Sequence, residues 1–267
     1  MKNYLSIREF SRLSGIEAST LRYWDEIKLF SPVKRHPDNN YRYYTPDQII
    51  AVNFITVLSS LDISLKTISE MENKRNPENI MELIDKQEIT LDRQMHCLRE
   101  AYSVIHTRRE LIKQGLRADI NEISVVNMPK RSMKLGQKNN YKKGENFYES
   151  FTGFCKDANN NQINLNYPIG GYHENIENFY AYPGNPDCFY SLDPEGNKTI
   201  EAGDYLVAYH NGYYGDFADF PEKIKKYAKK NNLDLYGPVY VIYLFDEICL
   251  EDRTSYLAQF CIPVKSK

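Results

Sequence analysis

The sequence contains no long apolar run and no recognisable N-terminal export segment. Its longest apolar stretches, such as Val239–Phe245, are far shorter than the roughly 18 residues that a membrane-spanning helix requires. Charged residues, beginning with Lys2 and Arg8, interrupt any apolar region near the N-terminus that could belong to a signal peptide, so none is predicted. We therefore expect a cytoplasmic protein that does not bind membranes.

Cysteine and histidine are few and scattered. The five cysteines are odd in number and form no C-x-x-C pair, and the five histidines lie far apart. The glycine-rich signatures of dinucleotide and phosphate binding are absent, as are the H-E-x-x-H and G-x-S-x-G signatures of hydrolases. The sequence therefore predicts no metal site, no cofactor and no enzyme.

Charge is nearly balanced overall, but it is unevenly distributed. The chain has 34 Lys+Arg and 36 Asp+Glu, so it is not a polycation that coats nucleic acid, and any nucleic-acid site must be local. Residues 1–50 carry a net charge of +2, whereas residues 151–267 carry −6. Of the 22 tyrosines, 16 lie in residues 141–267. The two halves of the chain are therefore expected to be built differently.

The first 75 residues predict short helices separated by turns. Ser6 and Glu9 form a capping box, and Gly15 ends the helix that it opens. A second helix begins at residue 18 or 19, so that two short helices flank a glycine turn, as in a helix-turn-helix. Residues 34–44 have the composition of a hairpin tip or wing. Thr45 and Pro46 then predict the start of a helix reaching residue 61, and Ser64 caps another that ends near residue 72.

The second helix and the wing carry side chains suited to DNA. Arg22 and Tyr23 lie off the apolar face of that helix, and Arg42 lies between two tyrosines in the wing. Such side chains contact phosphates, while a helix in the major groove reads base edges. The alternative is that these basic side chains are only exposed to solvent and bind nothing. The occurrence of neighbouring Arg and Tyr in both the helix and the wing disfavours this alternative. The predicted DNA-binding residues are Ser19, Thr20, Arg22, Tyr23, Tyr41, Arg42 and Tyr43.

Residues 77–115 form the longest periodic segment, with apolar residues spaced alternately by three and four. In an antiparallel pair centred near Leu98, Glu88 of one copy approaches Arg109 of the other, whereas a parallel pair stacks like charges. We predict an antiparallel homodimer that uses Ile84, Glu88, Leu91, Met95, Leu98, Tyr102, Ile105 and Arg109. The alternative is a helix that packs within its own monomer with both charges reaching water.

From residue 117 onward the pattern changes to short alternating strands and two amphipathic helices. Strands are expected at 122–127, 131–136, 167–173, 189–192, 203–210, 238–245 and 255–263, and helices at 145–158 and 221–231. Two successive strand-helix-strand-strand units imply an α+β domain with internal pseudo-symmetry, and a cleft between its halves is the natural ligand site. The predicted fold is multidomain, with an α-helical winged helix-turn-helix (residues 1–75), a long antiparallel coiled-coil helix (76–116) and an α+β pseudo-symmetric effector domain (117–267).

The segments TLRYWDEIKLFSP and NNYRYYT resemble the winged-helix DNA-binding domain of the MerR family of bacterial transcription regulators. The likeness covers residues 4 to about 72 and implies that Arg22, Tyr23 and Arg42 contact DNA, with Trp24 standing where tyrosine is usual. The segments GDYLVAYHNG, VYVIYLFDE and LAQFCIPV resemble the gyrase-inhibitor-like, BmrR-type effector domain of multidrug-sensing members.

This resemblance implies a ligand-responsive activator that binds double-stranded promoter DNA as a homodimer. Such regulators sit between promoter elements whose spacer is too long, and effector binding makes the dimer kink and untwist the DNA so that RNA polymerase can use both elements. RNA polymerase is therefore only an indirect partner. The effector is expected to be a small aromatic molecule, because the cysteines that metal-sensing relatives place around the long helix are absent here.

The resemblance also indicates the ligand site. Val241 stands where drug-sensing relatives bury a glutamate that pairs with cations, and Asp246 and Glu247 are the candidates to replace it. Aromatic walls favour flat or cationic ligands, although most tyrosines of this region are expected simply to pack in the sheet. The predicted ligand-binding residues are Tyr148, Phe151, Tyr172, Tyr209, Phe217, Val241, Tyr243 and Tyr256.

Two other classes of function remain open from the sequence. Some gyrase-inhibitor-like domains hydrolyse small molecules with tyrosine and glutamate in the same cleft, but the matched glutamate position is Val241 here. The third class is a repressor or DNA-bending architectural protein whose rear domain is a protein-interaction module.

Overall fold

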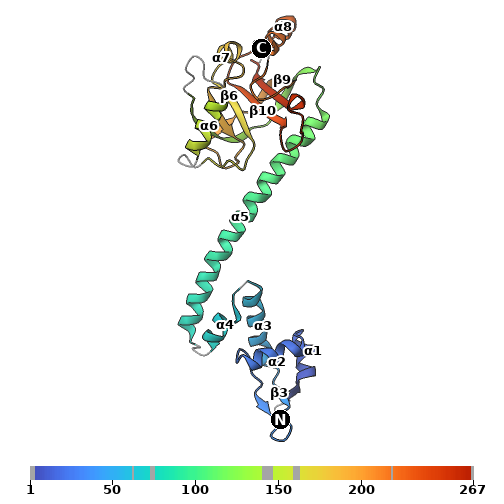
Figure 1. The fold of residues 1–267 in the computed structure, drawn as a ribbon, viewed down its shortest axis with the longest axis vertical. Helices are drawn as coiled ribbons and strands as arrows, with labels where there is room; N and C mark the ends of the chain where they lie inside the picture. Colours follow the sequence, from blue (N-terminus) through green and yellow to red (C-terminus); the bar gives the residue numbers. More distant parts are fainter. Residues whose placement is uncertain are drawn as a thin grey trace. The chain divides into compact units, whose positions relative to one another are not determined.

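The structure of the chain is a computed structural model that describes residues 4–61, 63–72, 76–139, 147–158, 163–217 and 219–265 (Figure 1). The chain divides into two compact units, residues 1–95 and 96–267, and each is described by itself. Residues 145 and 146 of the predicted helix 145–158 lie outside the described residues. Within the described ranges, no helix combines the length and the apolar character needed to span a bilayer.

The N-terminal unit consists of short helices and a three-stranded antiparallel sheet. Its elements are β1 (Leu5–Ser6), α1 (Ile7–Ser14), α2 (Ala18–Glu26), β2 (Lys34–Arg35), β3 (Arg42–Tyr44), α3 (Gln48–Ser60), α4 (Leu65–Glu72) and the first part of α5 (Pro77–Arg117). The strand order is β1-β3-β2. The rings of Phe10, Phe30 and Tyr44 stack at the centre of the core, with centroids 4.6–5.9 Å apart. These stacked rings join α1 to the β2–β3 hairpin.

Local signals in the sequence place most of these helix ends correctly. The Ser6 hydroxyl accepts from the Glu9 N–H while the Glu9 carboxylate accepts from the Ser6 N–H, and Gly15 ends α1 with a φ of 72°. The prediction that Thr45 and Pro46 open the third helix is wrong, because α3 begins at Gln48. The Gln48 side chain instead accepts from the Thr45 N–H at 3.1 Å, which holds the two residues in a turn before the helix.

Helix α5 confirms the long helix that the periodicity predicts, and it extends over 41 residues. Three consecutive members of the predicted seam, Leu98, Tyr102 and Ile105, are each about 70% exposed to solvent. The boundary between the two compact units falls inside this helix, after Met95. The middle of α5 thus carries an apolar face that the described residues of this chain leave uncovered, and pairing through it stays a prediction.

The C-terminal unit is built on one antiparallel sheet. Its strands are β4 (Ile123–Met128), β5 (Arg131–Lys138), β6 (Ile169–His173), β7 (Cys188–Ser191), β8 (Lys198–Ile200), β9 (Gly203–Asn211), β10 (Val239–Phe245) and β11 (Leu257–Pro263). Its helices are α6 (Phe147–Ala158), α7 (Ile176–Ala181) and α8 (Phe220–Lys230), with a 3-10 turn, η1 (Arg253–Ser255), before β11. The sequence predicts neither α7 nor β8, since six and three residues are too short to show a period.

The strand order confirms the predicted internal symmetry. The sheet runs β4-β9-β11-β10-β6-β7-β5-β8, with β10 and β6 paired antiparallel at its centre. The two strand-helix-strand-strand units are β5-α6-β6-β7 and β9-α8-β10-β11. Counting outward from the central pair, one half of the sheet reads β6, β7, β5 and the other reads β10, β11, β9. In both halves this is the second, third and first strand of the unit. The two units are therefore related by a pseudo-two-fold axis between β6 and β10.

Alternation along β10 divides the interior of this unit into two faces. Val239, Val241 and Tyr243 pack with residues of α7 and α8, whereas Ile242 and Leu244 pack on the opposite face, with Leu111 of α5. The end of α5 approaches closely at Gly115, where an added Cβ would lie 2.6 Å from the Phe245 ring. Burial on both faces explains why β10 reads as one continuous apolar run.

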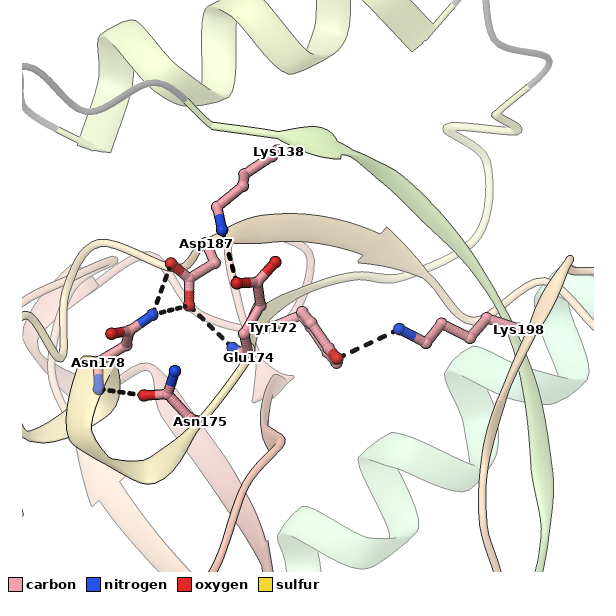
Figure 2. A network of polar contacts seen from close by, with 7 residues as sticks. All are labelled: Lys138, Tyr172, Glu174, Asn175, Asn178, Asp187 and Lys198. Carbon is pink, nitrogen blue, oxygen red and sulfur yellow. Dashed lines mark hydrogen bonds and ion pairs between the residues drawn. The ribbon is translucent and has the colours of Figure 1, made fainter.

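Polar contacts at the end of β6 set the start of α7 (Figure 2). The Asp187 carboxylate accepts from the Glu174 N–H at 2.8 Å and from the Asn178 amide, while the Asn175 side chain caps α7 by accepting from the Asn178 N–H at 2.8 Å. Lys138 of β5 reaches the Glu174 carboxylate at 2.6 Å. These contacts explain how so short a helix is defined.

His173 makes the stability of this unit dependent on pH. The residue is buried, and burial lowers its pKa from 6.5 to about 4, outweighing the opposing effects of Asp187 and of the Pro183 backbone. Between these two values the unfolded chain binds a proton that the folded chain does not, so stability falls as pH drops below 6.5. We expect a loss of about 2 kcal/mol between pH 7.5 and pH 5.

Urea unfolding followed by tyrosine fluorescence at the two pH values measures this loss. The His173→Leu variant removes the titrating group and is expected to lose distinctly less stability over the same range. An equal loss in the variant would assign the pH dependence to other groups.

Candidate functional site

The N-terminal unit presents α2 and the β2–β3 hairpin as its candidate DNA surface. Leu21 and Trp24 anchor α2 in the core, so that Arg22 and Tyr23 between them are exposed. Ser19 is exposed and Thr20 is half-buried at the start of the same helix. Tyr41 is exposed at the hairpin, while Arg42 and Tyr43 on β3 are half-buried. The predicted DNA-binding residues thus fall into one group on α2 and one on the hairpin.

A buried carboxylate links these two groups. Asp25 of α2 accepts hydrogen bonds from Arg42 Nε and from Arg35 Nη2, each at 2.5 Å. Arg42 therefore has one edge of its guanidinium committed inside the protein, and its side chain is 21% exposed. Burial, and then the negative charge of Asp25, raise the pKa of the underlying Tyr44 to about 12.

The C-terminal unit contains a cavity of about 590 Å³ beside α6. Segments far apart in the sequence line it, namely α6, residues 165–171, the loop after β9, the loop after β10 and one side chain each of α5, β7 and β10. Among its described lining residues, eight are aromatic: Phe147, Tyr148, Phe151, Tyr167, Phe189, Tyr213, Tyr214 and Tyr243. A cavity of this size and composition suits a small aromatic ligand.

The aromatic side chains hold one another in place. The Tyr214 ring stacks parallel to Phe147, with centroids 5.6 Å apart, and meets the edge of Tyr243 at 4.6 Å. The Tyr243 hydroxyl donates to the Tyr213 carbonyl oxygen at 3.2 Å, and the Tyr148 and Tyr213 hydroxyls are hydrogen-bonded to each other. The walls are thus ordered before any ligand enters, which lowers the entropy cost of binding.

Three charged side chains complete the lining. Arg108 of α5 donates to the Asp246 carboxylate, which is 10% exposed, and the two form an ion pair. Glu247 is exposed, and one of its oxygens accepts from the Tyr214 hydroxyl at 2.5 Å. Burial and this carboxylate raise the Tyr214 pKa well above its ordinary value, so the hydroxyl stays protonated. Glu247 is therefore the one charge of the described lining without a cation beside it.

Comparison with known proteins identifies the N-terminal unit. Residues 5–74 match the sequence profile of the MerR HTH family regulatory proteins, which spans the whole candidate DNA surface. This part of the chain is therefore similar to the DNA-binding part of MerR HTH regulators, and the match includes both α2 and the hairpin.

Similar proteins extend over nearly the whole chain. The multidrug-efflux transporter 2 regulator of Bacillus subtilis is 26% identical over 99% of this chain and 98% of its own. The multidrug-efflux transporter 1 regulator of the same organism is 25% identical over 91% of each chain. Among solved structures, an EcmrR–DNA complex matches 98% of this chain and 100% of that chain, at 18% identity and a TM-score of 0.40.

The cavity brings together three of the predicted ligand-binding residues, Tyr148, Phe151 and Tyr243. Tyr256 lies behind the lining, with its ring centroid 5.7 Å from that of Tyr214. Val241 is buried two residues before Tyr243 on the same face of β10. These two residues support the wall without being part of it.

The other three predicted ligand-binding residues lie away from this cavity. Tyr172 is on the opposite face of the sheet, where its hydroxyl accepts from Lys198 at 3.2 Å (Figure 2). Phe217 is buried against Phe260, and Tyr209 lines a separate cavity beside α8. Alternation along β6 explains the position of Tyr172, because Gly171 before it faces the cavity.

Reasoning from the sequence missed Phe147, Tyr213, Tyr214 and Arg108 as lining residues. The tyrosine pair had a usable signal, since it stands between two glycines directly after a strand, and Gly215 adopts a φ of 79°. Arg108 had none, because its partner Asp246 is 138 residues away in the chain.

Proposed function

We propose that this chain is a MerR-family regulator that binds promoter DNA as a homodimer and responds to a flat aromatic cation in the cavity of its C-terminal unit. The names of the two full-length Bacillus relatives, both regulators of multidrug-efflux transporters, support a response to small molecules. The predicted DNA-binding residues on α2 and the hairpin support the DNA contact. The function proposed is transcription activation.

One observation carries the choice of ligand: an aromatic cavity with an uncompensated carboxylate at Glu247. Asp246 is paired with Arg108, so these two charges cancel, whereas Glu247 accepts a hydrogen bond from the neutral Tyr214 hydroxyl and forms no ion pair within the described part of the chain. A cation near Glu247 is attracted by this negative charge. Where it lies over a tyrosine ring, the cation–π interaction adds roughly 0.5–2 kcal/mol per ring. Drug-sensing relatives bury a glutamate at the position of Val241, and in this chain Glu247 supplies the negative charge instead.

Helix α5 is the proposed link between ligand and DNA. Near its end, Arg108 reaches the cavity and Leu111 is buried against β10, so a change at the cavity acts directly on this helix. The dimer that α5 forms would kink and untwist the promoter spacer, so that RNA polymerase reaches both promoter elements. Ligand and DNA affinities are then coupled through the dimer by the same free energy in both directions.

The Glu247→Gln variant tests the ligand class. N-methylacridinium and acridine share one ring system and differ in a fixed positive charge, and their binding is measured by quenching of protein fluorescence. We expect the wild type to prefer the cation, and the variant to lose about three- to tenfold in affinity for it, because Glu247 is exposed and its charge is partly screened. Affinity for acridine should stay the same.

The Glu251→Gln variant is the matched control, since it removes the same charge from an exposed position that does not line the cavity. It is expected to bind both compounds as the wild type does. Equal losses of affinity for N-methylacridinium in the two variants would show that only the net charge of the protein matters, and not the position of Glu247. Binding of neither compound to the wild type would contradict the proposed ligand class.

A further inference from the structure

The ion pairs of Asp25 connect all parts of the candidate DNA surface. Asp25 lies in the last turn of α2, and its side chain is only 2% exposed. One carboxylate oxygen accepts from Arg35 on β2 and from Arg42 on β3, each at 2.5 Å. Arg35 and Arg42 are themselves cross-strand partners in the hairpin. A single carboxylate thus ties both strands of the hairpin to α2.

Stability of the fold alone does not explain this arrangement. Moving a carboxylate and parts of two guanidinium groups out of water is costly, and apolar residues of similar volume would often hold the same elements together as well. Arg35 is 40% exposed and Arg42 is 21% exposed, so the group reaches from the interior to the surface. The cations therefore remain accessible on the side away from Asp25.

We propose that Asp25 is a positioning residue for DNA recognition, which orients the outer edges of Arg35 and Arg42 toward phosphate oxygens. A guanidinium has five N–H groups, and Asp25 takes one from each arginine, while the Asn40 side chain accepts another from Arg35 at 3.3 Å. The remaining N–H groups are held in a fixed orientation, which reduces the entropy lost on binding. This inference rests on the proposed DNA binding, and Asp25 itself does not touch DNA.

The sign of the effect separates positioning from simple electrostatics. The Asp25→Asn variant removes a negative charge close to a polyanion, so electrostatics alone strengthens binding to every duplex. Positioning has the opposite consequence for the recognised sequence, because the amide holds the two guanidinium groups less firmly, and phosphate contacts that are less fixed no longer set the register in which α2 meets the base edges. The quantity to measure is therefore the ratio of the affinities for a recognised and an unrelated duplex. If Asp25 had only a structural or electrostatic role, a folded variant would keep this ratio.

The experiment uses the full chain and two probes. The first probe is the duplex that the wild type enriches from a library of random sequences, and the second is a scrambled duplex of the same composition. We expect the Asp25→Asn variant to bind the enriched duplex about tenfold more weakly, and the scrambled duplex with unchanged or slightly higher affinity. Thermal unfolding and the fluorescence of the neighbouring Trp24 establish that the variant is folded.

A second pair of variants keeps the test decisive if the Asp25→Asn chain does not fold. Arg35→Gln removes one partner of Asp25 on the surface, and Lys34→Gln removes the same charge from the adjacent residue, whose ammonium lies over the ring of Tyr4. Arg35→Gln is expected to lower discrimination between the two duplexes, whereas Lys34→Gln weakens binding to both alike.

Two results would overturn the inference while the proposed DNA binding stands. One is tighter binding of Asp25→Asn to both duplexes, and the other is an identical pattern for Arg35→Gln and Lys34→Gln. If the wild type enriches no sequence from the library, the proposed function fails and the inference fails with it. The two failures are therefore distinguished by the wild-type selection alone.

Discussion

A Leu98→Glu variant is expected to be monomeric and to lose binding to promoter DNA by about a hundredfold or more. Leu98 is 71% exposed in the single chain and stands at the centre of the predicted seam of α5. In an antiparallel pair it faces Leu98 of the second copy, so the substitution brings two carboxylates together in an apolar contact. Analytical ultracentrifugation measures the association, and titration with the enriched duplex measures the DNA affinity.

Charge exchange tests the direction of pairing. Glu88→Arg and Arg109→Glu each create two like-charged contacts in an antiparallel dimer, and the double variant restores both attractions. In the single chain, Arg109 contacts only nearby groups of its own helix among the described residues, His106 and Glu110. We expect each single variant to weaken the dimer and the double variant to recover it. Dimers unaffected by Leu98→Glu and by these exchanges would show that association does not use this seam.

An Arg108→Met variant is expected to destabilise the C-terminal unit by about 3 kcal/mol. Arg108 and Asp246 have side chains 22% and 10% exposed, so the substitution leaves a largely buried carboxylate without its cation. Among the described residues, the Asp246 carboxylate then retains only the Ile248 N–H as a hydrogen-bond donor, at 3.1 Å. Urea unfolding followed by tyrosine fluorescence measures the change.

Lys113→Met is the control for this prediction. Lys113 lies on the same helix and pairs with Glu110, but both side chains are more than 40% exposed. Its loss is expected to cost less than about 0.5 kcal/mol, as for other surface pairs. The Arg108→Met/Asp246→Asn double variant should recover most of the stability, because the unpaired charge is gone. Equal stability of Arg108→Met and Lys113→Met would show that the pair at the cavity is effectively solvated.

Arg108 also bears on the ligand. If Asp246 loses its cation, the cavity lining gains a second uncompensated carboxylate beside Glu247. A folded Arg108→Met chain is then expected to bind N-methylacridinium at least as tightly as the wild type. The effect of that binding on α5 would nevertheless be reduced, since the Arg108–Asp246 contact between this helix and the loop after β10 is gone.

The accuracy of the sequence predictions follows the range of the interactions concerned. The capping box at Ser6, the end of α1 at Gly15 and the extent of α5 depend on residues within a few positions of one another, and all three are confirmed. The internal symmetry of the C-terminal unit was predicted from a repeat visible in the chain, whereas the order of its strands came from the structure. The start of α3 differs from the prediction by two residues, because residues 46 and 47 form a turn and the helix begins at Gln48, although Gln48 accepts from the Thr45 N–H as at a helix N-terminus.

The sequence by itself determined the likeness to MerR HTH regulators, most helix ends and the extent of the long helix, because these reside in short segments whose pattern is complete on its own. Only the tertiary structure decided which charges compensate one another. Asp246 meets Arg108 across 138 residues, Glu247 meets Tyr214 across 33, and Asp25 meets both strands of the hairpin. Pairing between distant side chains depends on how the sheet and helices pack, and electrostatic compensation exists only once that packing is formed.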